Sequence, residues 1–346
     1  MALEVTGKYR YPNPQPEWLA RHTEEIIDPE RPIVDAHHHL WEEPGKVYLT
    51  DDLLADLRTG HRVVATVAVQ AHYGYRTTGP EHLQPVGETE MLEMHRREAW
   101  DRVPGLRPCA AIVGFANLLD TEQLDEVLDA HATISPGHFR GVRQSVARDS
   151  HFPQGVVLRP AQAGMLADPR LRQSVRRLGA RGLVFDAMLY HEQIPELSEL
   201  AGEGAETPIV LNHCGCPLGV GYYRGREQER FESWRRDVTE LARRPNVYMK
   251  IGGFGMIVTG AEYHLASRPP TSVQLAADWQ PWFEVCLEAF GAQRCMFESN
   301  FPVDKAMYSY AVGWNAFKRL ASGCSSTERD DLFAGTATRF YRLETA

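Results

Sequence analysis

The sequence has no apolar run long enough to cross a lipid bilayer. A membrane-spanning helix needs about 18 or more consecutive apolar residues, and no stretch of the 346-residue chain approaches this. Residues 1–8 also lack the apolar core of a signal peptide. We therefore expect no membrane partner, and we predict a cytoplasmic location.

The chain also has fewer basic than acidic side chains. The chain has 37 Lys and Arg against 46 Asp and Glu, which gives a formal net charge of -9. Nucleic acids and anionic membranes attract proteins with an excess of basic side chains, so this balance argues against both as main partners. We expect a small-molecule partner, and the sequence leaves a homo-oligomer open.

Cysteines are few for a chain of this length. The six cysteines are scattered, mostly within apolar segments, which is typical of reduced, buried thiols rather than of a disulfide framework. Cys214 and Cys216 are close together, but their spacing is one residue shorter than the Cys-x-x-Cys of zinc and redox motifs. We interpret them as packing residues.

Proline is concentrated at the start of the chain, at positions 12, 14, 16, 29 and 32. This density predicts that residues 1–32 form an irregular arm, without regular helix or strand, that wraps around the domain surface.

From residue 33 onward, short β-branched runs alternate with longer segments of helical period. Eight such units without a linker predict an α/β fold, a (β/α)8 TIM barrel over residues 33–346. The alternative is an open sheet with extra elements. The expected strands are 33–37, 63–69, 108–114, 139–145, 182–187, 208–213, 247–251 and 295–299. The expected helices are 51–58, 87–101, 121–131, 161–179, 192–203, 225–243, 278–290 and 305–320.

Two connections are longer than a barrel needs, residues 71–86 and 253–270. Both follow expected strands, so both belong to the C-terminal face, where barrel enzymes keep their substrate loops. Their candidate substrate contacts are His72, Tyr73, Tyr75, Arg76, His82, Met256 and Tyr263.

Two histidines end the first expected strand, in Ile33-Val-Asp-Ala-His-His-His-Leu-Trp41. Strand residues two apart point to the same side, so His37 and His39 face the barrel mouth together. His213 ends the sixth strand at the same mouth, and three converging imidazoles begin a metal site. For the pair alone, a His-rich turn that covers the mouth is the alternative. Asp35, on the same strand face, is placed to orient a histidine.

Three charged side chains lie in or end the other strands: Asp186, Arg143 and Lys250. A buried carboxylate needs a partner or a metal, so Asp186 is a candidate ligand or acid/base, with a helix cap or salt bridge as the alternative. The Arg143 guanidinium suits a carboxylate, and a structural bridge to Asp186 is its alternative. Lys250 must reach solvent or meet an anion, in a structural or substrate-binding role.

The eighth strand ends in Cys295-Met-Phe-Glu-Ser-Asn-Phe-Pro-Val-Asp-Lys305. Alternation places Glu298 and Asn300 on one face, with Asp304 in the loop or the first turn of the next helix.

Six segments carry a family pattern: Val34-Asp-Ala-His-His-His-Leu-Trp41, Phe139-Arg-Gly-Val-Arg143, Val184-Phe-Asp186, Asn212-His213, Val247-Tyr-Met-Lys-Ile-Gly-Gly253 and Phe297-Glu-Ser-Asn-Phe-Pro302. Together they resemble the amidohydrolase superfamily, in particular the lactonase-type barrels of the amidohydrolase-2 branch. The resemblance covers nearly the whole chain. It implies a hydrolase that adds water to a lactone, in some relatives with a divalent metal.

Carried over by position, the resemblance implies that His37, His39 and His213 line the site and that Arg143 helps to bind acidic substrates. Relatives commonly have Gly-Ser-Asp-Trp-Pro at the eighth strand, where the Asp activates water. This chain has Asn300 there, and an amide cannot accept a proton from water at neutral pH. The general base is therefore left open between Glu298, Asp186, Asp304 and His213, with Glu298 or Asp186 preferred.

The expected function is hydrolysis of a small carboxylated lactone or related cyclic ester. A non-oxidative decarboxylase of an aromatic or unsaturated acid, and a catalytically inactive barrel that serves for binding, are the alternatives. We expect a divalent metal, zinc as first choice, and no organic cofactor. The predicted catalytic residues are His213, Asp186, Glu298 and Asn300, the substrate-binding residues Arg143, Lys250, Tyr73, His72 and Arg76, and the metal ligands His37, His39, His213 and Glu298.

Overall fold

The computed structural model describes residues 11–43, 46–151, 161–203 and 206–344. Eight parallel strands form one sheet, in chain order around the barrel. The eight strands predicted from the sequence are thereby confirmed, with ends that differ by up to two residues. They are β1 (Ile33–His38), β4 (Val63–Val69), β5 (Arg107–Gly114), β6 (Phe139–Ser145), β7 (Val184–Met188), β8 (Ile209–Leu211), β9 (Val247–Ile251) and β10 (Cys295–Phe297).

The barrel closes between β1 and the segment that follows β10. The backbone N–H of His39 donates to the carbonyl of Phe301 (2.8 Å), and that of Asn300 donates to the carbonyl of His37 (2.9 Å). These bonds join the two ends of the sheet, so the predicted closed barrel is correct and the open sheet is not.

Asp35 stabilises this closure between β1 and the segment after β10. Its carboxylate accepts hydrogen bonds from the backbone N–H of Ser299 (2.9 Å) and from the hydroxyl of Tyr310 (3.0 Å). Burial raises the pKa of Asp35 to about 6. The expectation that Asp35 orients a histidine ring is wrong, because its partner on His37 is the backbone N–H (3.3 Å).

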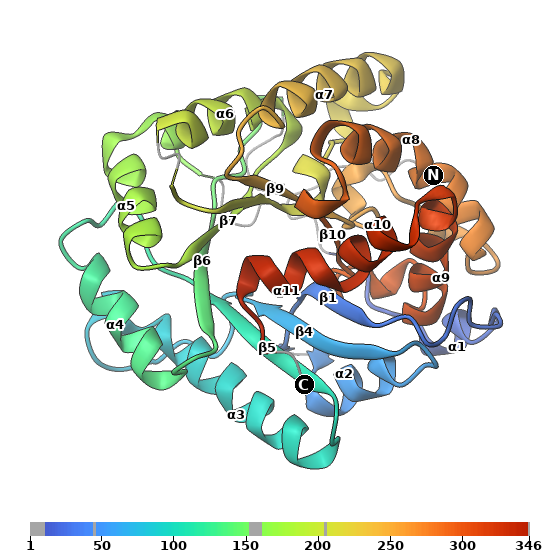
Figure 1. Ribbon diagram of the computed structural model, residues 1–346, viewed down its shortest axis with the longest axis horizontal. Coiled ribbons are helices and arrows are strands. Elements are labelled where there is room, and N and C mark those ends of the chain that lie inside the picture. The colour runs from blue at the N-terminus through green and yellow to red at the C-terminus, as the bar shows by residue number, and fades with distance from the viewer. Residues whose placement is uncertain (1–10, 44–45, 152–160, 204–205, 345–346) are drawn as a thin grey trace.

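One long helix follows each barrel strand, and the helices surround the barrel (Figure 1). The expected helix 161–179 begins late, at Pro169, because Asp168 caps it. The expected helix 278–290 begins early, because Thr271 and Gln274 form a capping box. The helices are α2 (Thr50–Leu57), α3 (Val86–Arg102), α4 (Leu124–Ile134), α5 (Pro169–Ala180), α6 (Ile194–Glu203), α7 (Glu227–Leu241), α8 (Ser272–Phe290) and α9 (Tyr310–Leu320).

The described part of the arm runs along the outside of the barrel. Trp18 donates from Nε1 to the carbonyl of Ala266 (2.9 Å), and Asn315 accepts the backbone N–H of Ile27 (2.9 Å). The expected absence of regular structure is wrong for one turn, α1 (Pro16–Leu19), where Pro16 occupies the first helical position that proline favours. The division into an arm of residues 1–32 and a barrel of residues 33–346 stays a prediction.

Several elements were not predicted. A two-stranded antiparallel pair, β2 (Trp41–Glu43) and β3 (Lys46–Tyr48), follows β1. After α9 come α10 (Ser326–Asp330), a π-helical turn η11 (Asp331–Gly335) and α11 (Thr336–Tyr341). In Figure 1, α11 lies across the middle of the ring of strands.

Two apolar clusters divide the core. The larger lies mainly between the strands and the surrounding helices. The smaller joins residues along the barrel strands, among them Val34, Val184 and Val210, to Phe340 and Tyr341 of α11. The last helix therefore plugs one end of the barrel and leaves the other end for polar side chains.

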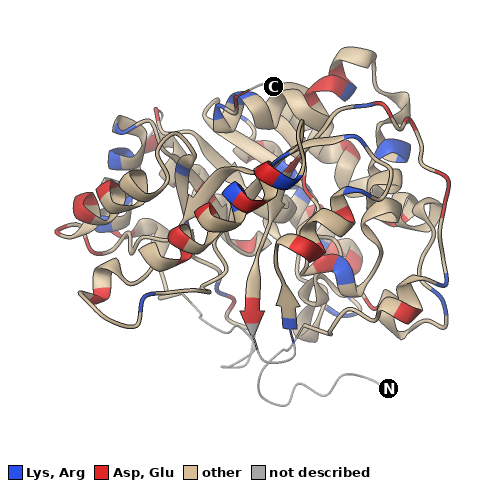
Figure 2. Cartoon of the chain, turned by 90° about the horizontal axis from the view of Figure 1, so that it is seen from below, with Lys and Arg blue, Asp and Glu red and all other residues tan. Residues whose placement is uncertain are grey.

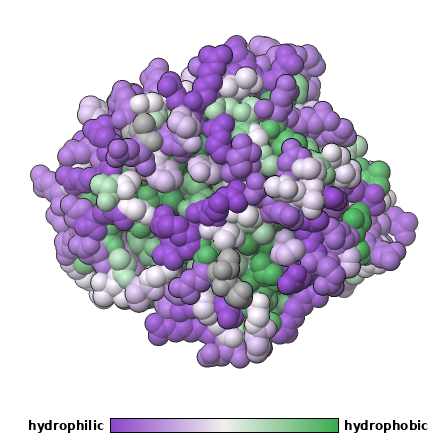
Figure 3. Space-filling model, viewed as in Figure 1, coloured by the Kyte–Doolittle hydropathy of each residue, from purple (hydrophilic) through white to green (hydrophobic). Residues whose placement is uncertain are grey.

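The outer surface is mostly polar. Acidic and basic residues are interspersed on the helices, whereas the barrel strands carry few (Figure 2). The face in Figure 3 is largely hydrophilic, with smaller hydrophobic patches between. No helix in the described part of the chain has both the length and the apolar character that a bilayer crossing requires. All six cysteines are free, and all except the half-buried Cys324 are buried, as predicted.

Candidate active site

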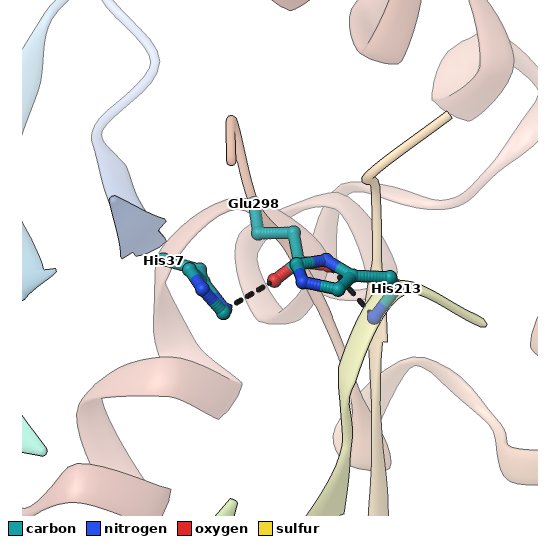
Figure 4. A group of neighbouring side chains, drawn as sticks. All are labelled: His37, His213 and Glu298. Atoms are coloured by element: carbon teal, nitrogen blue, oxygen red, sulfur yellow. Dashed lines mark hydrogen bonds and ion pairs between the residues drawn. The ribbon is translucent and has the colours of Figure 1, made fainter. Parts of the chain in front are cut away.

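Four predicted site residues meet at the end of the barrel opposite α11. Glu298 lies between two imidazoles (Figure 4): its Oε1 accepts a hydrogen bond from Nδ1 of His213 (2.7 Å), and its Oε2 lies 3.0 Å from Nδ1 of His37. His39 joins the group through its Nε2, 3.2 Å from Nε2 of His37. His37 and Glu298 are fully buried, whereas His213 and His39 retain 3% and 4% exposure.

Left-handed backbone brings His213 into this group. The strand β8 ends at Leu211, two residues earlier than predicted, and His213 and Cys214 follow with φ of 56° and 52°. Such conformations cost non-glycine residues on the order of 1 kcal/mol or more. The backbone N–H of His213 donates to Oε1 of Glu298 (2.9 Å), which holds the turn in place.

A glycine pair after β9 makes room for the two side chains. A Cβ on Gly252 would lie 2.5 Å from Cγ of Glu298, and one on Gly253 would lie 2.6 Å from the Cβ of His213. Both distances are below any real contact, so these positions require glycine while Glu298 and His213 lie where they do.

The imidazoles of His37 and His39 are suited to binding a cation. Nδ1 of His39 lies 2.8 Å from the carbonyl of Val69, a bond that places the proton on Nδ1 and leaves the lone pair on Nε2. Burial lowers the pKa of both rings well below the usual range, with the charge of Lys250 adding for His37 and that of Arg143 for His39. Both rings are therefore neutral, the form that binds metals.

The distances in the group also fit a metal. Two nitrogens on one tetrahedral zinc ion lie about 3.3 Å apart, close to the 3.2 Å between Nε2 of His37 and Nε2 of His39. Potential ligand atoms of His37, His213 and Glu298 lie within 4.8 Å of one another. Oε2 of Glu298 is buried and makes no contact with a polar atom of the described residues closer than Nδ1 of His37, at 3.0 Å. The donor set therefore fits a divalent cation.

Asp186 and Lys250 form a fully buried ion pair beneath the imidazoles. Nζ of Lys250 lies 2.6 Å from Oδ1 of Asp186 and 3.2 Å from Nδ1 of His37. Asn212 adds a hydrogen bond from Nδ2 to Asp186 (3.1 Å). Lys250 thus meets an anion inside the barrel, one of the two outcomes predicted for it, and Asp186 has Lys250 rather than Arg143 as its bonded cation.

Arg143, on β6, brings a positive charge to the mouth. It is partly exposed, its Nη1 lies 3.3 Å from Nε2 of His37, and its Nη2 donates to the carbonyl of Gln70. Nε of Arg143 is buried without a partner among the described residues. The guanidinium is therefore held at one end and adjoins the imidazole cluster at the other.

Asn300 faces a carboxylate rather than the imidazoles. Its Nδ2 donates to Oδ1 of Asp304 (2.9 Å). The other oxygen of Asp304 accepts from the hydroxyl of Tyr308 (2.7 Å) and the backbone N–H of Gly255 (2.8 Å). Burial raises the pKa of Asp304 to about 7, and the charge of Glu298 adds to this. Both carboxylate oxygens of Asp304 are occupied.

A cavity of about 770 Å³ lies at the end of β6, where Gln144 and Ser145, the two residues after Arg143, line it. Ser145 lines it, and Ser145 shares a strand face with Arg143 because it lies two residues further along β6. His72, Tyr75 and Phe115 form an aromatic wall, with ring centroids 5.2 to 6.4 Å apart. None of the described residues that line the cavity is Lys or Arg. Its amide side chains are Gln84, Asn117, Gln123, Gln144 and Gln162.

The predicted loop residues divide between this cavity and other places. His72, Tyr75 and His82 line the cavity. A smaller cavity of about 250 Å³, around Asp149 and Tyr223, contains none of the predicted site residues. The remaining loop candidates are engaged elsewhere: Tyr73 bonds Glu42, Arg76 pairs with Glu90, Tyr263 bonds Asp278, and Met256 is buried.

Two buried residues of this region were not predicted. Glu88, in the first turn of α3, accepts the backbone N–H of Ala71 (2.6 Å) and of Tyr73 (3.2 Å), and so holds the loop after β4. Tyr341 of α11 contacts Asp186. A glutamate early in a helix is a weak signal of such an anchor, and no pattern near the C-terminus distinguishes Tyr341.

Known proteins are similar to this sequence along nearly its full length. The profile of the family described as amidohydrolase matches residues 34–343. An uncharacterised protein of Sinorhizobium fredii, y4mH, is 31% identical over 334 residues, which cover 90% of this chain and 98% of that protein. An L-fucono-1,5-lactonase of Burkholderia multivorans is 26% identical, with 90% and 96% covered.

Solved structures also resemble this chain over most of its length. A crystal structure of an amidohydrolase from Burkholderia multivorans with bound zinc has a TM-score of 0.68 at 26% identity, over 90% of this chain and 99% of that one. The same amidohydrolase with bound HEPES has a TM-score of 0.69. From its barrel, its family profile and these relatives, the chain belongs to the amidohydrolase family and is a hydrolase.

Proposed function

We propose that this protein hydrolyses a lactone, adding water to the ring ester to give the open hydroxy acid. The observation that carries the proposal is the pairing of His213 with Glu298. The carboxylate holds Nδ1 of His213 and leaves Nε2 without a hydrogen-bond partner among the described residues. This is the arrangement of an imidazole general base. Relatives named as L-fucono-1,5-lactonases support the same reaction.

The alternative bases are less suited to the role. Asp186 is fully buried and bonded to Lys250 and Asn212. Glu298 is shared by two imidazoles, and Asp304 has both oxygens occupied. The preference for Glu298 or Asp186 as the base therefore gives way to His213, with Glu298 as its partner.

In this assignment, His213 alone carries out both proton transfers of the reaction. Nε2 of His213 removes a proton from water as the water oxygen attacks the lactone carbonyl, and the Glu298 carboxylate stabilises the imidazolium that forms. Arg143 adjoins the imidazoles and supplies positive charge for the oxyanion. The imidazolium of His213 returns its proton to the ring oxygen as the C–O bond breaks.

A divalent cation would be held by His37 and His39, whose Nε2 atoms lie 3.2 Å apart. Glu298, also predicted as a ligand, lies 3.0 Å from the other ring nitrogen of His37, Nδ1. Zinc is the first choice, because the Burkholderia multivorans relative has been solved with zinc bound. When bound, such a cation polarises the carbonyl of the ester. His213, also predicted as a ligand, is assigned here to proton transfer.

The substrate class that we propose is neutral and rich in hydroxyl groups, rather than carboxylated. Lys250, one of the two cations expected to hold a substrate carboxylate, is fully buried and paired with Asp186. The described lining of the cavity offers amides, aromatic faces and the carboxylates of Glu81 and Asp120, and no Lys or Arg, which suits hydroxyl groups and ring surfaces. The names of the relatives, L-fucono-1,5-lactonase and L-rhamnono-gamma-lactonase, support this class.

The test is acid release from a panel of neutral sugar lactones, carboxylated lactones and aromatic acids. We expect turnover of the neutral lactones and its loss in His213→Ala. His138→Ala is the control, because His138 lies outside the imidazole cluster and its Nδ1 bonds a backbone carbonyl (3.1 Å) instead of a carboxylate. Carbon dioxide from aromatic acids without lactone turnover would identify a decarboxylase. No turnover and no bound zinc would identify a binding protein.

A further inference from the structure

Tyr341 reaches the chemical centre from the closed end of the barrel. It is the last residue of α11, which packs against residues of the smaller apolar cluster such as Val184 and Val210. Its side chain is fully buried. Figure 1 shows α11 over the middle of the strands, so this residue belongs to the plug and not to the mouth.

The hydroxyl of Tyr341 bonds the Asp186 carboxylate. It lies 3.0 Å from Oδ1 and 2.9 Å from Oδ2. Oδ1 also accepts from Lys250 and Asn212, whereas the described residues give Oδ2 no other hydrogen bond. Burial raises the pKa of Tyr341 well above the usual value, which keeps the phenol neutral and able to donate.

This bond is one end of a line of contacts that reaches the imidazoles. Lys250 lies 2.6 Å from Asp186 and 3.2 Å from Nδ1 of His37, and its Nζ is 5.3 Å from the centre of the Tyr341 ring. A buried ion pair keeps its geometry when further hydrogen bonds satisfy its remaining polar atoms. Tyr341 satisfies the oxygen of Asp186 that Lys250 does not.

We propose that Tyr341 is a positioning residue of the catalytic centre, which fixes the Asp186 carboxylate and through it the placement of Lys250 against His37. The inference rests on the proposed function, since it assigns Tyr341 to the same reaction. Without the hydroxyl, Oδ2 of Asp186 is left bare in apolar surroundings, and the carboxylate turns to find another donor. Lys250 follows it, and the ring of His37 loses its support.

The first experiment is Tyr341→Phe, which removes one oxygen and keeps the ring that packs in the plug. We expect kcat for lactone hydrolysis to fall about 10- to 100-fold, as for other groups that orient a histidine of a catalytic site, with KM changed less than about 3-fold. Tyr248→Phe is the matched control, because Tyr248 packs on Phe340 of the same helix (ring centroids 4.7 Å). It should keep the wild-type kcat. Unchanged kcat in Tyr341→Phe would overturn the proposal.

A double-mutant cycle separates positioning from general loss of structure. If Tyr341 acts through Asp186, adding Tyr341→Phe to Asp186→Asn should lower kcat by less than about 2-fold further. Multiplying effects in the double variant would overturn the proposal.

A third readout needs no substrate. The 15N resonances of the His37 ring, assigned with His37→Gln, should shift in Tyr341→Phe and not in Tyr248→Phe. Unshifted resonances would overturn the role of Tyr341, even if the wild-type protein proved to hydrolyse no lactone. In that case the proposed function alone would fail.

Discussion

Two regions on the side of the barrel where the strands end differ in burial and in the groups that line them. Around Glu298, the side chains carry charges or metal-binding nitrogens and are almost completely buried. The cavity at the end of β6 is open and is lined by aromatic rings, amides and the carboxylates of Glu81 and Asp120, with no described Lys or Arg. The first region comes mainly from strand ends and the turns directly after them, and the second mainly from loops and α4.

The difference separates reaction from recognition. Strand ends in a closed barrel are held by the sheet, so they can keep imidazoles and carboxylates at hydrogen-bonding distance despite the cost of burial. Loops are free to vary without disturbing that geometry. We therefore expect changes around Glu298 to alter kcat and changes in the cavity to alter KM.

The largest effect on kcat is expected when the imidazole cluster around Glu298 is altered. Glu298→Gln removes the charge that stabilises the His213 imidazolium, so kcat for lactone hydrolysis should fall about 10²- to 10⁴-fold, with a smaller change in KM. Asp304→Asn is the matched control, because it alters the other buried carboxylate near Asn300. Steady-state kinetics of both variants provide the measurement, and a greater loss in Asp304→Asn would transfer the role of the base to Asp304.

The next effect concerns the cation. His39→Ala removes one of the two closely spaced imidazole nitrogens. The zinc content should therefore fall below about one equivalent per chain, and the zinc affinity should weaken by 10-fold or more, at least as much as when a group that supports a metal ligand is lost. Metal analysis after dialysis measures this directly. His138→Ala should retain the wild-type zinc content, and equal zinc in both variants would exclude His39 as a ligand.

A smaller effect is expected in the cavity. Phe115→Ala removes part of the aromatic wall against which a ring substrate packs, so KM should rise about 10-fold while kcat changes little, corresponding to roughly 1–1.5 kcal/mol of lost contact. Phe231→Ala on α7, a partly buried phenylalanine outside the cavity, is the control. A fall in kcat without a rise in KM would contradict the division between the two regions.

The last effect leaves both regions in place and changes the pH dependence of stability, with the smallest change expected in activity. Burial raises the pKa of Glu88 from 4.5 to about 7, so the folded protein binds this proton more tightly than the unfolded chain. The associated stabilisation is complete below about pH 4.5 and is lost as the pH rises through 7, up to about 3 kcal/mol.

Glu88→Gln has no such proton to lose, so its free energy of unfolding should fall less than that of the wild type between about pH 5 and pH 8. Denaturant unfolding at the two pH values measures the difference. Ala71 and Tyr73 keep an acceptor in the variant, because the amide oxygen replaces Oε1. An unchanged slope would mean that Glu88 is ionised in the folded protein throughout this range.

Parts of this picture were predictable from local pattern. Strand periodicity placed His37 and His39 on one side of β1, and the βα alternation placed His213 and Glu298 at the same end of the barrel. Helix starts were less accurate where a capping signal such as Thr271 and Gln274 was overlooked. The role of Asp35 was wrong, because its partners Ser299 and Tyr310 are more than 260 residues away in the chain.

The sequence by itself determined the barrel and the end of it at which the imidazoles lie, because periodicity and strand ends are local properties that a repeated βα pattern converts into a shared mouth. The family followed from the resemblance of six motifs. The tertiary structure alone decided which partner each charge has. Glu298 bonds His213, Lys250 bonds Asp186, and Tyr341 bonds Asp186 from the plug. A charge buried in a barrel can be satisfied by any strand or helix that reaches it, and sequence spacing does not rank such distant partners.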